Sequence, residues 1–104
     1  MGDERYGVIG HPESNWLLLK KAGFGVTWAK VYPVLSGKNF LLTAKHFSEI
    51  LKDVLNRTDY RIGIFGIGED GHTSGILPHS EALYINELVC AYESPLRDRI
   101  TITT

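Results

Sequence analysis

The sequence has little of several features that mark specialised classes of protein. It has a single cysteine, Cys90, so no disulfide can form within the chain, and we expect a reduced protein of the cytoplasm. No apolar run approaches the roughly 20 residues that span a bilayer, and the acidic, polar start does not resemble a secretory signal. The formal net charge is only -1, from 11 basic and 12 acidic residues. We therefore expect neither a membrane nor a nucleic acid as partner.

What the sequence does contain is sufficient for a folded domain. Its 104 residues are 43% hydrophobic and 22% charged, without repeats or low-complexity segments, so we treat 1–104 as a single domain. Ser14 and Asn39 are typical helix N-caps, and Gly23 is a typical helix stop. Runs of β-branched and apolar residues predict strands. The predicted helices are 15–22 and 40–55, and the predicted strands are 28–35, 61–65, 88–92 and 99–103.

Helices and strands alternate through the middle of the chain. This order predicts an α/β fold with a largely parallel sheet. The run 61–65 is apolar and β-branched, as in a strand buried on both faces. The last predicted strand ends the chain without a covering helix, so we expect the sheet to be truncated or reduced.

A glycine-rich loop at 66–75 follows the predicted strand 61–65. Its first six residues match the dinucleotide-binding pattern G-x-G-x-x-G, which requires a helix that starts at Gly71. Gly75 and Pro78 leave little room for that helix, and the carboxylates of Glu69 and Asp70 would repel a pyrophosphate. Dinucleotide binding therefore remains the weaker interpretation.

The same loop presents Asp70 and His72, two residues apart. A histidine can take a proton from water, and a nearby carboxylate can fix its tautomer. The alternative is a structural aspartate that caps a turn, with a histidine hydrogen-bonded in it. A metal site that adds His79 lacks further ligands. Ser74 does not fit the nucleophile pattern G-x-S-x-G.

Three blocks of the sequence, in order, resemble the 6-phosphogluconolactonase family. The loop G-I-G-E-D-G-H-T at 66–73, followed by Pro78, resembles the family signature G-x-G-x-D-G-H-T-A-S-L-F-P. D-E-R-Y at 3–6 with H-P-E-S-N at 11–15 resembles the D-E-R-x-V-P and S-N segments. S-P at 94–95 with R-I-T-I-T at 99–103 resembles a later strand of the family.

Glucosamine-6-phosphate deaminases share the glycine loop and are the nearest alternative. Their pattern continues D-G-H-I-A-F-N-E-P and opens with D-E-Y. Here Thr73 follows His72, no Asn-Glu pair precedes Pro78, and Arg5 stands where that family has tyrosine. The sequence therefore resembles the lactonases more closely.

The resemblance implies a Rossmann-like three-layer fold and hydrolysis of 6-phospho-D-glucono-1,5-lactone in the pentose phosphate pathway. It implies that His72 activates water, that Asp70 orients His72, and that Arg5 holds the phosphorylated lactone. It implies no metal and no cofactor. The further substrate-binding residues that we predict are Gly68, Gly71 and Thr73.

The family's domain is more than twice as long as this chain, so we expect 1–104 to be a partial 6-phosphogluconolactonase-like domain. The family's glycine-rich phosphate loop and its substrate-binding lysine have no counterpart here. A phosphosugar-binding fragment without catalysis is therefore a further alternative. Exposed sheet edges also predict a homo-oligomer.

Overall fold

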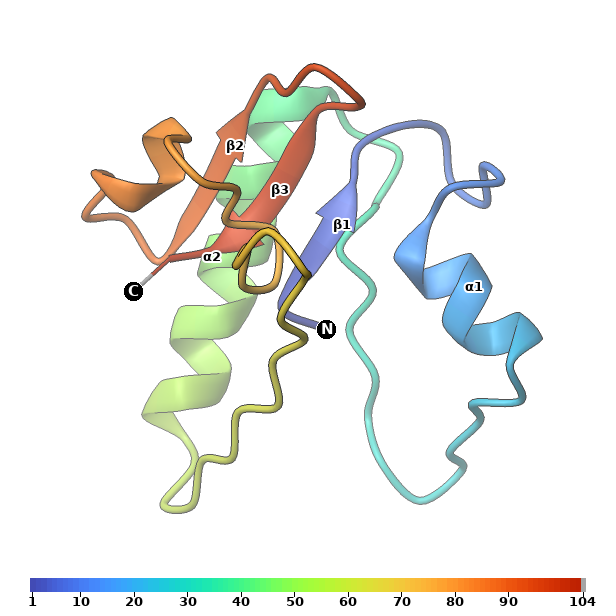
Figure 1. Cartoon of the computed structure of the whole chain (residues 1–104). Helices are drawn as coiled ribbons and strands as arrows, with labels where there is room; N and C mark the ends of the chain where they lie inside the picture. Colours follow the sequence, from blue (N-terminus) through green and yellow to red (C-terminus); the bar gives the residue numbers. More distant parts are fainter. Residues whose placement is uncertain (104) are drawn as a thin grey trace.

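The computed structural model describes residues 1–103 and has short strands and helices arranged around one small sheet (Figure 1). In the described residues the helices and strands are, in chain order, β1 (Asp3–Arg5), α1 (Asn15–Lys21), α2 (Phe40–Asn56), the 3-10 helix η1 (Glu81–Leu83), β2 (Val89–Tyr92) and β3 (Arg99–Ile102). No helix within 1–103 is both long and apolar enough to cross a membrane.

The sheet has the order β1-β3-β2, and both of its strand pairs are antiparallel. Glu4 lies opposite Ile100 in one pair, and Ala91 lies opposite Ile100 in the other. The prediction of a largely parallel sheet is therefore wrong for the described residues, although the α/β class is right. A parallel pair needs a crossover of about a dozen residues, whereas a short turn that includes Ser94 and Arg97 joins β2 to β3.

Two of the predicted strands are absent from the described structure. The runs 28–35 and 61–65 are both loop, although their composition suits strands. In the second run the side chains of Ile62 and Ile64 are 88% and 93% exposed. A strand is stable only beside a neighbour that pairs with its backbone, and neither run has such a neighbour within 1–103. Pro33 removes one backbone donor from the first run as well.

Both α-helices begin directly after their predicted N-cap residues. The Ser14 side chain accepts a hydrogen bond from the backbone N–H of Leu17, and the Asn39 side chain accepts one from Leu42. Gly23, just beyond the end of α1, has a φ of +91°, which glycine adopts without strain. These local signals were sufficient because capping involves only residues within one turn.

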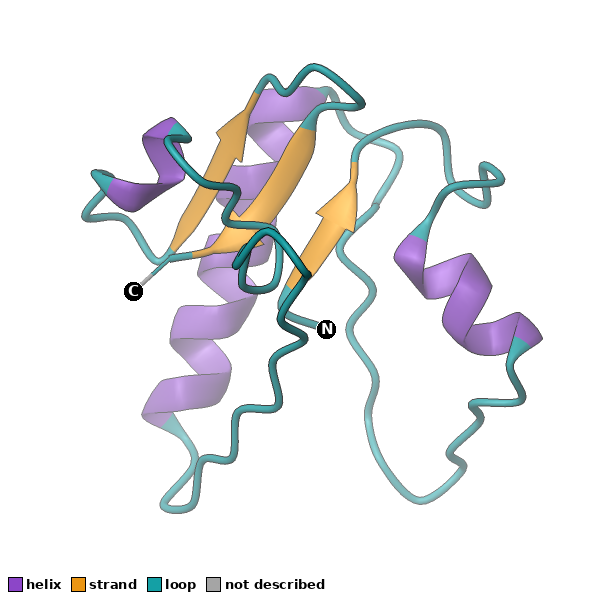
Figure 2. Ribbon diagram, in the orientation of Figure 1, coloured by secondary structure: helices purple, strands orange, loops and turns teal. Residues whose placement is uncertain are grey.

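The sheet is covered on both faces (Figure 2). The helix α2 packs along one face of β2 and β3, and the segment that contains η1 lies against β2 on the other side. Alternate residues of each strand point to opposite faces, which explains why the core has two clusters. The buried members of the first cluster are Val34, Ala44, Phe47, Val89 and Ile100, and those of the second are Ala82, Cys90 and Tyr92.

Candidate functional site

The structure brings Asp70 and His72 together in the glycine loop. The ring Nδ1 of His72 lies 2.5 Å from Asp70 Oδ1, and the His72 backbone N–H donates to the same oxygen at 3.2 Å. Two backbone bonds close the loop around this pair, from Gly68 N–H to the His72 carbonyl at 2.8 Å and from Gly71 N–H to the Gly68 carbonyl at 2.9 Å. The pair is thus held by its own loop.

The hydrogen bond favours the charged form of Asp70. Donation from the His72 ring, and then from the His72 backbone, holds the pKa of Asp70 below its ordinary value. Asp70 is therefore a carboxylate at neutral pH and acts as the acceptor, so Nδ1 of the neutral imidazole carries the proton. The other ring nitrogen, Nε2, is then the one with a free lone pair, as a general base requires.

The structure gives steric reasons for glycine at two positions of this loop. A Cβ at Gly68 would lie 2.2 Å from Cε1 and 2.3 Å from Nδ1 of His72, so a side chain at that position would displace the imidazole. Gly71 has a φ of +84° at the turn between Asp70 and His72. Both glycines therefore shape the pair, and their direct contact with a substrate remains a prediction.

This packing gives a testable consequence for Gly68→Ala. We expect the new methyl group to displace the His72 ring from Asp70 and so to break the hydrogen bond between them. Nitrogen-15 NMR of the His72 ring measures the loss of that bond. The matched control is Gly66→Ala, because a Cβ there meets nothing within 4 Å. Identical His72 ring signals in the two variants would contradict the steric role of Gly68.

The geometry of the loop favours neither dinucleotide binding nor a metal site that includes His79. A pyrophosphate site needs a helix that starts at Gly71, and the residues that follow it form turns and isolated bridges with Ile67 and Ile76 instead. Among residues 1–103 no three His, Cys, Asp or Glu side chains lie close enough together to hold a metal, so His79 does not complete a ligand set with Asp70 and His72.

Thr73 lies beside two hollows in the surface. One, of about 350 Å³, is lined by Gly71, Thr73 and Leu77 among others. The other, of about 290 Å³, is lined by Thr73, Ser74 and Ile102 among others. His72 lines neither hollow. Thr73 is therefore placed where a ligand beside the loop could meet it, and its role as a binding residue remains a prediction.

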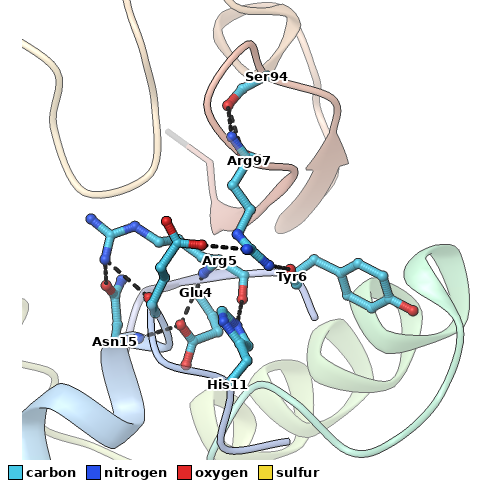
Figure 3. A network of polar contacts seen from close by, with 8 residues as sticks. Glu4, Arg5, Tyr6, His11, Asn15, Ser94 and Arg97 are labelled. Atoms are coloured by element: carbon cyan, nitrogen blue, oxygen red, sulfur yellow. Dashed lines mark hydrogen bonds and ion pairs between the residues drawn. The ribbon is translucent and has the colours of Figure 1, made fainter. Parts of the chain in front are cut away.

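Arg5 stands at the end of β1 and is held from the start of α1 (Figure 3). Its Nη1 donates to the side-chain Oδ1 of Asn15 at 3.0 Å and to the backbone carbonyl of Glu13 at 3.0 Å. In the described residues Arg5 makes no hydrogen bond to Asp70 or His72. The predicted site residues therefore form two groups, the histidine loop and the arginine.

Residues that were not predicted as site residues link these two groups. The Asn15 amide donates to Asp3 Oδ2 at 2.9 Å, and the Ser74 hydroxyl donates to Asp3 Oδ1 at 3.0 Å. Ser74 lies two residues beyond His72, in the left-handed region with a φ of +54°. Asp3 and Arg5 are two residues apart, a spacing that places both side chains on the same face of a strand. All residues of Asp3–Arg5 are polar, however, so the sequence did not predict a strand there.

Below this chain of contacts lies a fully buried carboxylate, Glu4. It accepts from the backbone N–H groups of Asn15 at 2.5 Å, Trp16 at 3.0 Å and Arg5 at 2.9 Å, and from the Ser14 hydroxyl at 2.9 Å. Glu4 thereby satisfies free donors at the start of α1 and locks that helix to β1. The position of Arg5 relative to Asn15 depends on these hydrogen bonds between β1 and the start of α1.

Fold and loop together define the class: a small α/β protein with a histidine–carboxylate pair on a glycine-rich loop, beside a strand that carries an arginine. The chain belongs to the family of glucosamine-6-phosphate isomerases and 6-phosphogluconolactonases, whose sequence model matches residues 1–104. The resemblance seen in the sequence is therefore confirmed at the level of the family.

Two relatives carry the same name, "6-phosphogluconolactonase". The protein from Nostoc sp. is 28% identical over 112 residues, and the protein from Synechocystis sp. is 26% identical over 122 residues. Each alignment covers 98% of this chain and 47% of the relative. The chain thus spans about half the length of the curated relatives it matches.

Proposed function

We propose that this chain acts in the hydrolysis of 6-phospho-D-glucono-1,5-lactone to 6-phosphogluconate, a step of the pentose phosphate pathway, in the cytoplasm. The observation that carries the proposal is the 2.5 Å contact between His72 Nδ1 and Asp70 Oδ1. It supports His72 as the base and Asp70 as its orienting partner within one loop. The name 6-phosphogluconolactonase, which both relatives carry, supports the choice of substrate.

In this mechanism His72 Nε2 removes a proton from water while the water oxygen attacks the lactone carbonyl carbon. The carbonyl electrons move onto oxygen and form a tetrahedral intermediate. Collapse of the intermediate breaks the bond from that carbon to the ring oxygen, and the imidazolium returns its proton to the ring oxygen. Asp70 stabilises the imidazolium in between. One water is consumed, and the product acid then ionises.

Arg5 is proposed to bind the phosphate of the lactone. A guanidinium has five N–H donors in a rigid fork that suits phosphate oxygens. Within 1–103 its contacts to Asn15 and Glu13 both use Nη1, so Nη2 and Nε keep their donors for an anion. A positive side chain also raises the local concentration of a phosphorylated substrate.

The test compares lactones with and without the phosphate. We expect the chain to accelerate hydrolysis of 6-phospho-D-glucono-1,5-lactone above its spontaneous rate, and to act much more weakly on glucono-1,5-lactone. Release of ammonia from glucosamine 6-phosphate would instead support the deaminase alternative. Binding of 6-phosphogluconate without any turnover would support a non-catalytic fragment and contradict the hydrolysis.

We also propose that the chain associates with a second copy of itself through unpaired strand-like backbone. The run 60–67 exposes apolar side chains, including Ile62 and Ile64, and the outer edges of β1 and β2 have no neighbour among the described residues. Unpaired edges of this kind are templates for pairing with another chain.

Sedimentation velocity tests the self-association. We expect a dimer or larger species, and we expect the double variant Ile62→Lys/Ile64→Lys to shift the distribution toward monomer. Val8→Lys is a suitable control, because Val8 is also 78% exposed but lies outside the run. A wild-type chain that sediments only as a monomer at every concentration would rule the proposal out.

A further inference from the structure

Asn15 lies between a cation and an anion. Its Oδ1 accepts a hydrogen bond from Arg5 Nη1 at 3.0 Å, and its Nδ2 donates one to Asp3 Oδ2 at 2.9 Å. A carboxamide serves both neighbours, because it accepts at one end and donates at the other. An aspartate at this position would repel Asp3, and a leucine of similar size would bond to neither neighbour.

The two charged residues would otherwise attract each other. Asp3 and Arg5 are two residues apart on β1, so their side chains leave the strand on the same face. Opposite charges that are neighbours on one face readily form an ion pair. In the described residues no ion pair joins them, and each is hydrogen-bonded to the Asn15 amide instead.

We propose that Asn15 is a positioning residue that holds the Arg5 guanidinium away from Asp3 and so keeps its charge available for the phosphate of the substrate. This inference rests on the proposed function, which assigns the phosphate to Arg5. Without Asn15 the guanidinium folds onto the Asp3 carboxylate, and the N–H donors that would meet the phosphate are used within the protein. Anion affinity then falls although Arg5 is still present.

The same contacts fix the distance from the arginine to the base. Asp3 uses its second carboxylate oxygen to accept from the Ser74 hydroxyl at 3.0 Å, and Ser74 is part of the loop that carries His72. Ser74 is itself tied to the start of the loop through its N–H, which donates to the Gly66 carbonyl at 2.9 Å. Asn15 therefore positions Arg5 relative to His72 as well as away from Asp3.

The side chain of Asn15 can be changed without removing the start of α1. The N-cap of that helix is Ser14, and the contact from residue 15 to Glu4 uses the backbone N–H, which every residue except proline has. Asn15→Leu therefore removes the side-chain hydrogen bonds to Arg5 and Asp3, including a longer one from Nδ2 to the Asp3 backbone carbonyl at 3.4 Å, and leaves the capping contacts in place. This separation makes the variant informative.

Calorimetric titration with 6-phosphogluconate and with gluconate is the first experiment. We expect the wild-type chain to prefer the phosphorylated ligand, and Asn15→Leu to lose about tenfold in affinity for it, because a charge-assisted contact is lost. The double variant Asp3→Asn/Asn15→Leu should regain most of that affinity, since the competing carboxylate is gone. Asn56→Leu, an exposed change of the same kind on α2, should bind as the wild type does.

The inference would be overturned if Asn15→Leu bound 6-phosphogluconate as tightly as the wild type does. It would also be overturned if the double variant bound this ligand as weakly as Asn15→Leu does. A crystal structure of Asn15→Leu decides it independently of the proposed function. We expect Arg5 paired with Asp3 in that structure, and a guanidinium that keeps its wild-type position would count against the inference. A wild-type chain that does not distinguish 6-phosphogluconate from gluconate would instead remove Arg5 from phosphate binding, while the crystal structure still tests the positioning.

Discussion

His72→Ala is expected to lower the rate of 6-phosphogluconolactone hydrolysis by about 10²–10⁴-fold, the usual contribution of a positioned general base. The loss should appear in kcat, because in the proposed mechanism the imidazole acts on the attacking water while Arg5 binds the phosphate. The measurement is the steady-state rate of lactone hydrolysis, corrected for the spontaneous reaction. The circular dichroism spectrum should not change, since His72 lies on an exposed loop outside both core clusters.

Two further variants define the result for His72. His46→Ala removes an imidazole from α2 that is hydrogen-bonded to no residue within 1–103, and it should leave the rate unchanged. Asp70→Ala leaves the base in place but removes its orienting partner, so its loss should be smaller than that of His72→Ala. Equal rates for His72→Ala and His46→Ala would exclude His72 as the base.

Glu4→Gln is expected to destabilise the fold by about 2–4 kcal/mol, the range for a buried polar group left facing the wrong partners. Glu4 is fully buried and accepts hydrogen bonds from four donors, of which the Asn15 and Trp16 N–H groups start α1. A glutamine turns one of its two acceptor atoms into a donor, which then faces at least one N–H or O–H. Urea unfolding followed by circular dichroism measures the change in free energy.

The matched control for this prediction is Glu49→Gln, which makes the same chemical change on the exposed face of α2. Its free energy of unfolding should stay within about 0.5 kcal/mol of the wild type, as for other surface substitutions. If Glu4→Gln unfolds at the same urea concentration as Glu49→Gln, the buried carboxylate does not lock α1 to β1.

The parts of the fold that depend on neighbouring residues could be predicted from the sequence. Ser14 and Asn39 predicted the starts of both helices, because a cap bonds to backbone only three residues away. The contact between Asp70 and His72 could be predicted for the same reason, because the two residues are two positions apart in one turn.

Contacts between distant parts of the chain could not be predicted in this way. Strand β1 is made of three charged residues with no apolar alternation, and it exists because β3 pairs with it from the other end of the sequence. The opposite error occurred at 61–65, where the composition suits a strand but no strand of the described part of the chain pairs with it. The bond from Ser74 to Asp3 spans 71 residues, so no spacing rule could reveal that Asp3 belongs to the site.

The tautomer of His72 tests the central claim most directly. The claim is that Asp70 holds the proton on Nδ1 and so leaves Nε2 free to act as base, as the 2.5 Å contact requires. Nitrogen-15 NMR of the labelled chain, above the pH at which the imidazolium loses its proton, distinguishes the two ring nitrogens. We predict a protonated Nδ1 and an unprotonated Nε2, with that preference lost in Asp70→Ala. A proton found on Nε2 in the wild-type chain would contradict the assignment of His72 as the general base.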